Sequence, residues 1–197
     1  MFHFIAQEST SREDGHMKLV IASDIHGAAD ACGRLMDVID TERPDRVILL
    51  GDLLYHGPRN DLPADYAPKR VIGMLNERAD VISAVRGNCE AEVDQMVLDF
   101  PCMAAYLELL DTEADKMLFC THGHVYGPGL HNSVHNLPRL AAGDTLVFGH
   151  THIKVNQPCE DVPGTHLFNP GSVGIPKDGT RSCGVYENGM FRHVLLG

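Results

Sequence analysis

Short apolar runs that each lead into a polar motif are the feature of this sequence that most constrains its fold. The runs cover residues 18–23, 46–50, 81–85, 117–121 and 145–149, and the motifs beside them are built from Asp, His, Asn and Gly. Apolar runs of about four to eight residues bounded by turn-forming residues are typical of buried strands. The sequence therefore predicts a set of buried strands whose carboxyl ends carry polar side chains.

The segments between the first strands have helical periodicity. Amphipathic stretches at residues 29–41, near 68–78 and at about 91–99 alternate with the strands. In the first of them Leu35 and Ile39 belong to an apolar stripe, which marks one face of a helix. The first half of the chain is thus expected to form βαβ units.

The second half of the chain has a different pattern. It contains strands with little helix between them, except for one short helix expected near residues 133–140. The tail alternates apolar segments with Asn-Gly and Gly-rich turns, which is typical of antiparallel hairpins. The additional strands are expected at residues 106–110, 165–169, 182–188 and 190–196.

This order of elements predicts an α/β fold in which two packed sheets carry helices on their outer faces. The sequence contains no internal repeat, low-complexity tract or interdomain linker. A length of 197 residues suits one domain with one sizeable core. The expected organisation is a single domain over residues 17–197.

Residues 1–16 differ in composition from the rest of the chain. The stretch QESTSREDGH is polar and aperiodic, and a strand begins directly after Met17. Such a segment is expected to be a disordered extension outside the core fold. The alternative is an ordered arm at an oligomer contact, which Phe2, Phe4 and Ile5 would anchor.

Charge and cysteine spacing exclude several classes of protein. A net charge of −11 opposes binding of long nucleic acids, because such surfaces usually carry a basic stripe. It is compatible with a small phosphate substrate, because bound cations reverse the local field. The six cysteines form no CxxC pair, and neither a secretory signal nor a membrane-spanning apolar run is evident. We therefore expect a cytoplasmic protein with reduced thiols and no membrane association.

The polar motifs share a small set of side chains. Because ligands bind beyond the carboxyl ends of strands in open α/β sheets, the motifs are expected to converge. Carboxylate, imidazole and amide oxygen together suit Mn²⁺, Fe²⁺, Zn²⁺ or Mg²⁺ rather than thiolate-preferring ions. The motifs are Asp24-Ile25-His26-Gly27, Gly51-Asp52, Gly87-Asn88-Cys89-Glu90, His122-Gly123-His124 and Gly149-His150-Thr151-His152.

Each motif has a simpler interpretation when it is taken alone. A strand-end aspartate often caps a helix or forms a turn. A single buried histidine is often a hydrogen-bonded core group, and a His-x-His pair also occurs on exposed strand faces. Five motifs in order, all at strand ends, favour one shared metal site over separate structural roles.

The order of these motifs resembles that of the calcineurin-like metallophosphoesterases. The series D-x-H, G-D, G-N-C-E, H-G-H, G-H-T-H and N-P-G-S extends over the chain from about Met17 onward, and it is most similar to the small bacterial phosphodiesterases of this superfamily. The resemblance implies a four-layer αββα sandwich with the site at its edge. It also implies two divalent metal ions, with manganese expected and iron, zinc, magnesium or nickel as alternatives.

The resemblance also assigns side chains to the two ions. The first ion would be held by Asp24, His26, Asp52 and His152, and the second by Asp52, Asn88, His122 and His150. Asp52 would bridge the pair. Two ions about 3.5–4 Å apart share a hydroxide that attacks phosphorus and expels an alcohol or phenol.

One position departs from the family pattern. Cys89 stands where many members have a histidine that contacts phosphate and protonates the leaving oxygen. A neutral thiol is a weaker donor than imidazolium. Cys89 is either a catalytic thiol or a space-filling side chain, and we favour the second because free cysteine behaves as a small hydrophobe.

Substrate contacts are expected from Asn88, His124 and Arg59. His124 either acts as a catalytic group facing the phosphate or makes a structural hydrogen bond. Arg59 either touches the substrate or is an exposed loop charge. The segment Asn169-Pro170-Gly171-Ser172 is expected to form a turn that supports the metal-bearing loops.

The expected function is hydrolysis of phosphodiesters by a metal-bound hydroxide. The alternatives are hydrolysis of phosphomonoesters and a non-catalytic protein-binding scaffold of the same fold. The complete ligand set argues against the scaffold. The expected partner is a small phosphate ester, and the chain is expected to form a homo-oligomer, either a dimer or a tetramer.

Overall fold

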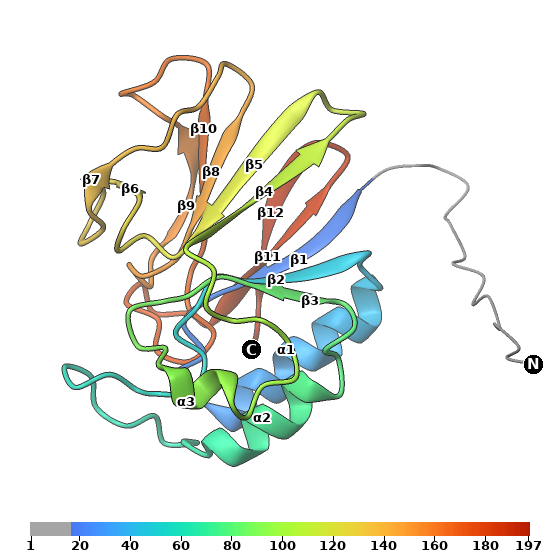
Figure 1. The fold of residues 1–197 in the computed structure, drawn as a ribbon, viewed down its shortest axis with the longest axis vertical. Coiled ribbons are helices and arrows are strands. Elements are labelled where there is room, and N and C mark those ends of the chain that lie inside the picture. Colours follow the sequence, from blue (N-terminus) through green and yellow to red (C-terminus); the bar gives the residue numbers. More distant parts are fainter. Residues whose placement is uncertain (1–16) are drawn as a thin grey trace, which may run out of the picture.

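The computed structural model describes residues 17–197. The extension expected at residues 1–16 lies outside these described residues, so its order stays a prediction. Two five-stranded sheets face each other at the centre of the molecule, and a short two-stranded ribbon lies beside the second sheet (Figure 1).

The first sheet combines the N-terminal βα units with the C-terminal hairpin. Its strands are β1 (Lys18–Ala22), β2 (Arg46–Leu49), β3 (Ile82–Ala84), β11 (Ser182–Glu187) and β12 (Met190–Leu195). They lie in the order β12-β11-β1-β2-β3, and β1, β2 and β3 are parallel. Three carboxyl ends therefore lie side by side at one edge.

The second sheet comes from the middle of the chain. Its strands are β4 (Tyr106–Asp111), β5 (Lys116–Thr121), β8 (Thr145–Phe148), β9 (Lys154–Pro158) and β10 (His166–Pro170). They lie in the order β4-β5-β8-β10-β9, with β5, β8 and β10 parallel. The carboxyl ends of β5 and β8 are therefore neighbours as well.

Apolar side chains separate the layers. Along β1, Leu19 and Ile21 pack between the two sheets, whereas Val20 and Ala22 pack beneath the helices. This alternation follows from the two-residue period of a strand. A strand that is apolar on both faces is therefore buried on both faces, as the sequence predicted.

The helices cover the outer face of the first sheet (Figure 1). They are α1 (Ala29–Glu42), α2 (Pro68–Asn76) and α3 (Glu92–Gln95). No side chain at the start of α1 caps it, but the Asp65 carboxylate accepts the N–H groups of Asp30 and Ala31, each at 3.1 Å. A residue distant in sequence thus satisfies the first turn of α1.

The outer face of the second sheet is covered without a helix in the described part of the chain. A loop with the ribbon β6 (Gly127–Pro128) and β7 (His135–Asn136) places apolar side chains such as Leu137 and Leu140 on this face. The prediction of a helix near residues 133–140 was wrong. Pro138 lacks an N–H group and interrupts helical hydrogen bonding at this point.

The α/β class and the two-sheet sandwich are confirmed. Besides the helix expected near residues 133–140, two local features differ from the sequence-based expectation. The helix expected at residues 91–99 ends at Gln95, because the Asn76 side chain binds the Asp99 N–H at 3.0 Å and the Val97 carbonyl at 2.9 Å. Strand β9 was not predicted, since as an edge strand it is largely exposed and polar.

Candidate metal centre

Loops that follow five strands converge at one edge of the sandwich. The first sheet contributes the loops after β1, β2 and β3, and the second sheet contributes those after β5 and β8. These loops bring together all the side chains that the sequence assigned to metal ions, namely Asp24, His26, Asp52, Asn88, His122, His150 and His152.

The backbone at most of these positions is left-handed. The φ angle is 56° at Asp24, 49° at His26, 55° at Asp52, 68° at His150 and 59° at His152. Positive φ is uncommon outside glycine and persists where surrounding contacts hold it. One such contact is the hydrogen bond from the His26 N–H to the Asp52 carbonyl, at 2.9 Å.

The Asp24 carboxylate is fully buried, and only one of its two oxygens accepts hydrogen bonds. Its Oδ2 accepts the Ser23 hydroxyl at 2.6 Å and the His150 N–H at 3.0 Å. Its Oδ1 has no hydrogen-bond partner. A buried carboxylate oxygen without a donor is costly, so this atom needs a positive charge beside it.

Backbone carbonyls fix the tautomers of the buried histidine rings. The Nδ1 atoms of His26, His122 and His152 lie 2.7 Å from the carbonyls of Tyr55, Leu50 and Ile175, respectively. A carbonyl only accepts, so each Nδ1 carries the proton and donates it. In the neutral ring, which is the form that binds a metal ion, the lone pair of each Nε2 is therefore directed into the centre, as in metal-binding histidines.

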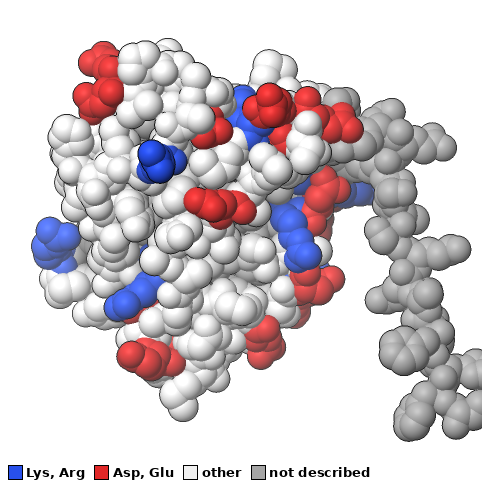
Figure 2. Space-filling view, turned by 45° about the horizontal axis from the view of Figure 1, so that its top comes forward, with Lys and Arg blue, Asp and Glu red and all other residues white. Residues whose placement is uncertain are grey.

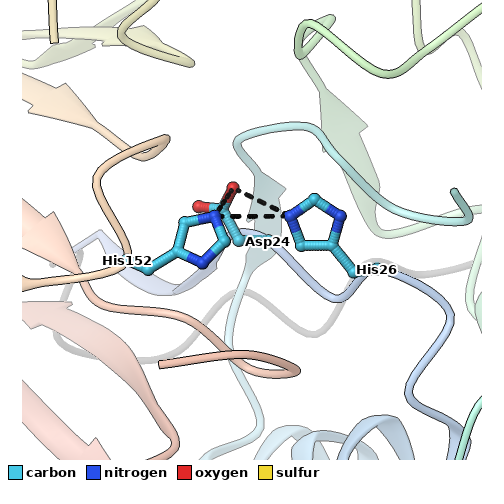
Figure 3. Close-up of side chains that lie close together, drawn as sticks. All are labelled: Asp24, His26 and His152. Atoms are coloured by element: carbon cyan, nitrogen blue, oxygen red, sulfur yellow. Dashed lines mark hydrogen bonds and ion pairs between the residues drawn. The ribbon is translucent and has the colours of Figure 1, made fainter. Parts of the chain in front are cut away.

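Asp24 Oδ1 and the Nε2 atoms of His26 and His152 form a tight triangle (Figure 3). His152 Nε2 lies 3.2 Å from Asp24 Oδ1, His26 Nε2 lies 3.6 Å from the same oxygen, and the two nitrogens are 3.3 Å apart. Metal–ligand bonds to nitrogen and carboxylate oxygen are about 2.0–2.2 Å long. Ligand atoms around one such ion are separated by distances of this size, so the triangle fits a cation.

A second group of ligand atoms lies next to the first. His122 Nε2 is 3.1 Å from Asn88 Oδ1, 3.2 Å from His150 Nδ1 and 3.4 Å from Asp52 Oδ2. The same Asp52 oxygen is 3.6 Å from His26 Nε2 in the first group. Asp52 therefore lies between the two groups, at the position of a bridging ligand.

Opposite charges support each other within the cluster. Burial raises the pKa of the Asp24 carboxyl. The interactions with His152, His26 and His122 lower this pKa by more than burial raises it, so the net pKa lies well below its usual value. Burial lowers the pKa of His122, but Asp52 and Asp24 raise it to about 9. The carboxylates thus hold positive charge in their midst.

Glu90 organises the loops from behind and was missed as a functional residue. Its buried carboxylate accepts the N–H groups of Asp52 at 2.9 Å and Leu53 at 2.7 Å. It thereby ties the loop after β3 to the loop after β2. A Cβ atom at Gly87 would lie 2.1 Å from Asp52 Oδ1, so glycine is required there. The G-N-C-E motif was the available signal.

The turn expected at residues 169–172 supports the centre from below. The Ser172 hydroxyl donates to the Asp24 carbonyl at 2.8 Å, and the Asn169 amide donates to the Gly149 carbonyl at 2.9 Å. Both acceptors belong to loops that carry candidate metal ligands. The position of this turn is consistent with the supporting role that the sequence suggested.

The two predicted catalytic side chains, Cys89 and His124, have different surroundings. Cys89 is half-buried, and burial together with Asp52 raises the pKa of its thiol, which stays protonated. The His124 ring packs 5.3 Å from the His122 ring, and burial and His122 lower the His124 pKa to about 4. His124 Nδ1 is buried without a hydrogen-bond partner.

A cavity of about 240 Å³ opens above the metal ligands. Cys89 and Arg59 line it, whereas His124 is not among its described lining residues. Lys177 and Asn132 also line it, and sequence reasoning did not single them out. Both lie in loops whose course depends on tertiary packing, so no local motif identified them.

Comparison with known proteins decides the family. The model of the calcineurin-like phosphoesterase superfamily domain matches residues 17–188. The chain belongs to this superfamily. It is 44% identical over 181 residues to phosphodiesterase YfcE of Escherichia coli (strain K12). The aligned region covers 91% of this chain and 92% of YfcE.

Solved structures agree with this assignment. The structure of YfcE, a phosphoesterase from E. coli, superposes with a TM-score of 0.80 at 41% identity and covers 92% of this chain and all of that one. An archaeal phosphodiesterase shares the fold, with a TM-score of 0.59 at 18% identity over 91% of this chain and 99% of its own. The predicted family is thus confirmed, and the protein is a phosphoric ester hydrolase by family.

No helix within residues 17–197 is long and apolar enough to span a bilayer.

Proposed function

We propose that this protein hydrolyses phosphodiesters with two divalent metal ions held in the cluster. The observation that carries the proposal is the convergence of lone pairs. The Nε2 atoms of His26, His122 and His152 face carboxylate oxygens while their Nδ1 protons are donated elsewhere. The buried Asp24 Oδ1 has no donor of its own, so this donor set fits cations.

The positions of the side chains support one assignment of ligands. Asp24, His26, Asp52 and His152 would hold one ion, and Asp52, Asn88, His122 and His150 would hold the other. Manganese is the proposed metal, because the donors are carboxylate, imidazole and amide oxygen; iron, zinc, magnesium and nickel suit them too. When bound, the ions would lower the pKa of a water molecule and stabilise charge on phosphoryl oxygens.

Polar side chains at the cavity would orient the phosphate. Arg59 and Lys177 line the cavity and would offset the negative charge of a phosphoryl group. The exposed Asn88 side chain lies at the same wall, and its amide would contact a phosphate oxygen. We retain His124 as a proposed catalytic group; its ring contacts that of His122, and it is not among the described lining residues of the cavity.

The protonation states favour particular leaving groups. The Cys89 thiol keeps its proton near neutral pH, because burial and Asp52 raise its pKa. It is therefore a weak acid toward a leaving oxygen. The His124 ring is neutral near neutral pH, because its pKa is lowered to about 4, so it is not an imidazolium that could give a proton to the leaving oxygen. These groups favour diesters whose alcohol or phenol departs without strong acid assistance.

The surface supports a small substrate. On the face shown in Figure 2, acidic and basic side chains of the described residues are interspersed, and no continuous basic stripe crosses that face. The net charge of −11 acts in the same direction. We therefore propose a small phosphate ester rather than a long nucleic acid.

Metal depletion tests the proposed function. Chelated protein should lose hydrolysis of a bis(aryl) phosphodiester, and Mn²⁺ should restore it together with a metal content of about two ions per chain. Full activity in protein shown by metal analysis to be metal-free would contradict the mechanism.

We also propose a cytoplasmic homo-oligomer. The six cysteines are free thiols, which supports a reducing compartment. Light scattering on the purified chain would report the dimer or tetramer that we expect.

A further inference from the structure

An apolar groove of about 400 Å³ opens beside the metal centre. It lies between the loop that precedes α2, the start of α2, and α3, which are close together in Figure 1. Its walls include Tyr55, Tyr66, Ile72, Val93 and Val97. Val93 is 60% exposed and Val97 is 39% exposed, so the groove is open to solvent.

Cys89 connects this groove to the metal centre. Its side chain lines both the groove and the cavity above the ligands. Its backbone N–H donates to Asp52 Oδ1 at 2.8 Å. The Cys89 side chain therefore lies between the cavity and the groove, and a molecule over the cluster would extend past it into the groove.

Two aromatic walls of the groove are also attached to the centre. The Tyr55 carbonyl accepts the His26 Nδ1 proton at 2.7 Å. The Tyr66 ring packs on the backbone that follows His26, since a Cβ atom at Gly27 would lie 2.5 Å from that ring. The groove is thus built from the same loops as the metal centre.

We propose that this groove binds one ester arm of the substrate, and that this arm is an aromatic group of about the size of a bicyclic ring. The inference rests on the proposed function, because the phosphate of the same molecule would lie over the cluster. Tyr55 and Tyr66 line the groove, and aromatic pairs favour stacked or edge-to-face contacts with such a group. The volume is sufficient for it.

The two sides of Cys89 differ in chemistry. Arg59 and Lys177 line the cavity side, whereas the groove side is apolar and carries the carboxylate of Asp94. A carboxylate at the wall opposes an anionic arm. The substrate is therefore an unsymmetrical diester, with its apolar arm in the groove and its polar arm toward the cavity.

A pair of substrates tests the groove with manganese-loaded protein. Methyl 2-naphthyl phosphate and methyl phenyl phosphate have leaving groups of similar acidity but different apolar area. The KM of the naphthyl ester should be about tenfold lower, because extra apolar groups in a fitting pocket give a change of this order. Equal KM values for the two esters would overturn the proposal that the groove binds an aromatic ester arm.

Matched variants locate the effect. Val97→Gln makes the groove wall polar, and Ala91→Phe fills it; both should raise the KM of the naphthyl ester to that of the phenyl ester with kcat nearly unchanged. Met96→Gln is the control, because Met96 is 82% exposed and neighbours Val97 without belonging to the described groove lining. Equal effects of Met96→Gln and Val97→Gln would contradict the proposal.

Two other outcomes are informative. If the groove variants change the oligomeric state in light scattering but leave the ratio of KM values intact, a second copy of the chain occupies the groove and the proposal is wrong. If the manganese-loaded protein hydrolyses no phosphodiester, the proposed function fails and the groove proposal fails with it.

Discussion

Hydrogen bonds to backbone carbonyls set the orientation of three imidazole rings before any ion binds. Each of these bonds, to Tyr55, Leu50 or Ile175, uses the Nδ1 proton and leaves Nε2 available. Such outer contacts commonly change metal affinity or activity by about 10–100-fold when they are removed. Here the acceptors are main-chain atoms, so no side-chain substitution deletes them directly.

Asp52→Asn should lower both the metal content and kcat. Asp52 Oδ2 lies 3.6 Å from His26 Nε2 and 3.4 Å from His122 Nε2, so an amide at this position would weaken both proposed sites. We expect a loss of kcat of at least about 100-fold and fewer than two ions per chain by metal analysis. The exposed Asp61→Asn variant is the charge control. Unchanged metal content in Asp52→Asn would contradict the bridging role.

Cys89 variants should separate packing from catalysis. Because the thiol is protonated and half-buried, Cys89→Ala and Cys89→Ser should leave kcat within a few-fold of the wild type. Rates over a series of phosphodiesters should depend steeply on the leaving-group pKa, since general acid catalysis worth about 10²–10⁴-fold is missing. Cys89→His should flatten this dependence. Collapse of activity in both small variants would instead identify the thiol as catalytic.

Position at strand ends allowed the sequence to predict which side chains meet at the sheet edge as candidate metal ligands. Asp24 and Asp52 directly follow apolar runs, so their location at the sheet edge needed only the strand assignment. Lys177 and Asn132 could not be found this way. They reach the cavity from loops, and the course of a loop depends on contacts that no local pattern encodes.

At the scale of elements, α1 depends on a distant residue for its first turn. Asp65 accepts two N–H groups of α1 and also pairs with Arg181 at 3.2 Å. Partial burial raises the pKa of the Asp65 carboxyl, but the hydrogen bond from Ala31 and the charge of Arg181 outweigh it and leave the pKa lowered. This carboxylate holds a helix, a loop and the segment before β11 together.

Asp65→Ala should reduce the free energy of unfolding by about 1–2 kcal/mol, as loss of a helix cap does. Because the folded pKa is lowered, this contribution is present above the unfolded pKa of about 3.9 and is lost as pH falls through the folded value. Urea unfolding at pH 7 and at acidic pH should show the difference from wild type shrinking in acid. Asp61→Ala, exposed in the same loop, should show no comparable difference.

The strands were predicted well because buried runs have a clear composition, and the errors fall where tertiary contacts decide. Leu137 and Leu140 have helical spacing, yet they cover the second sheet from an extended loop. Strand β9 pairs with β10 at the sheet edge, where an apolar pattern is not required.

At the scale of the whole molecule, the loops that carry the proposed ligands follow strands of both sheets. Removal of residues 1–16 should leave kcat and Tm unchanged, because every proposed ligand lies within residues 17–197. Steady-state kinetics and calorimetry of the shortened chain would test this. A marked fall in Tm would show that the extension packs on the domain.

Bound metal should raise Tm. A ligand that binds only the folded chain stabilises it in proportion to the logarithm of its concentration over Kd, by about 2.7 kcal/mol at one hundred times Kd. Thermal scans at increasing Mn²⁺ should therefore move upward for the wild type and less for Asp52→Asn. A Tm independent of Mn²⁺ would mean that the cluster does not bind the ion.

His26 and His152 come from different sheets and are separated by 126 positions in sequence. An ion held by both would act as a reversible staple across most of the chain, closing a loop long enough for a covalent cross-link to contribute about 4–5 kcal/mol in the chain-entropy description. Metal starvation would then lower the free energy of unfolding and raise the fraction of unfolded chains that proteases can cleave. The cellular abundance of the protein would follow the supply of metal, independently of its turnover of substrate.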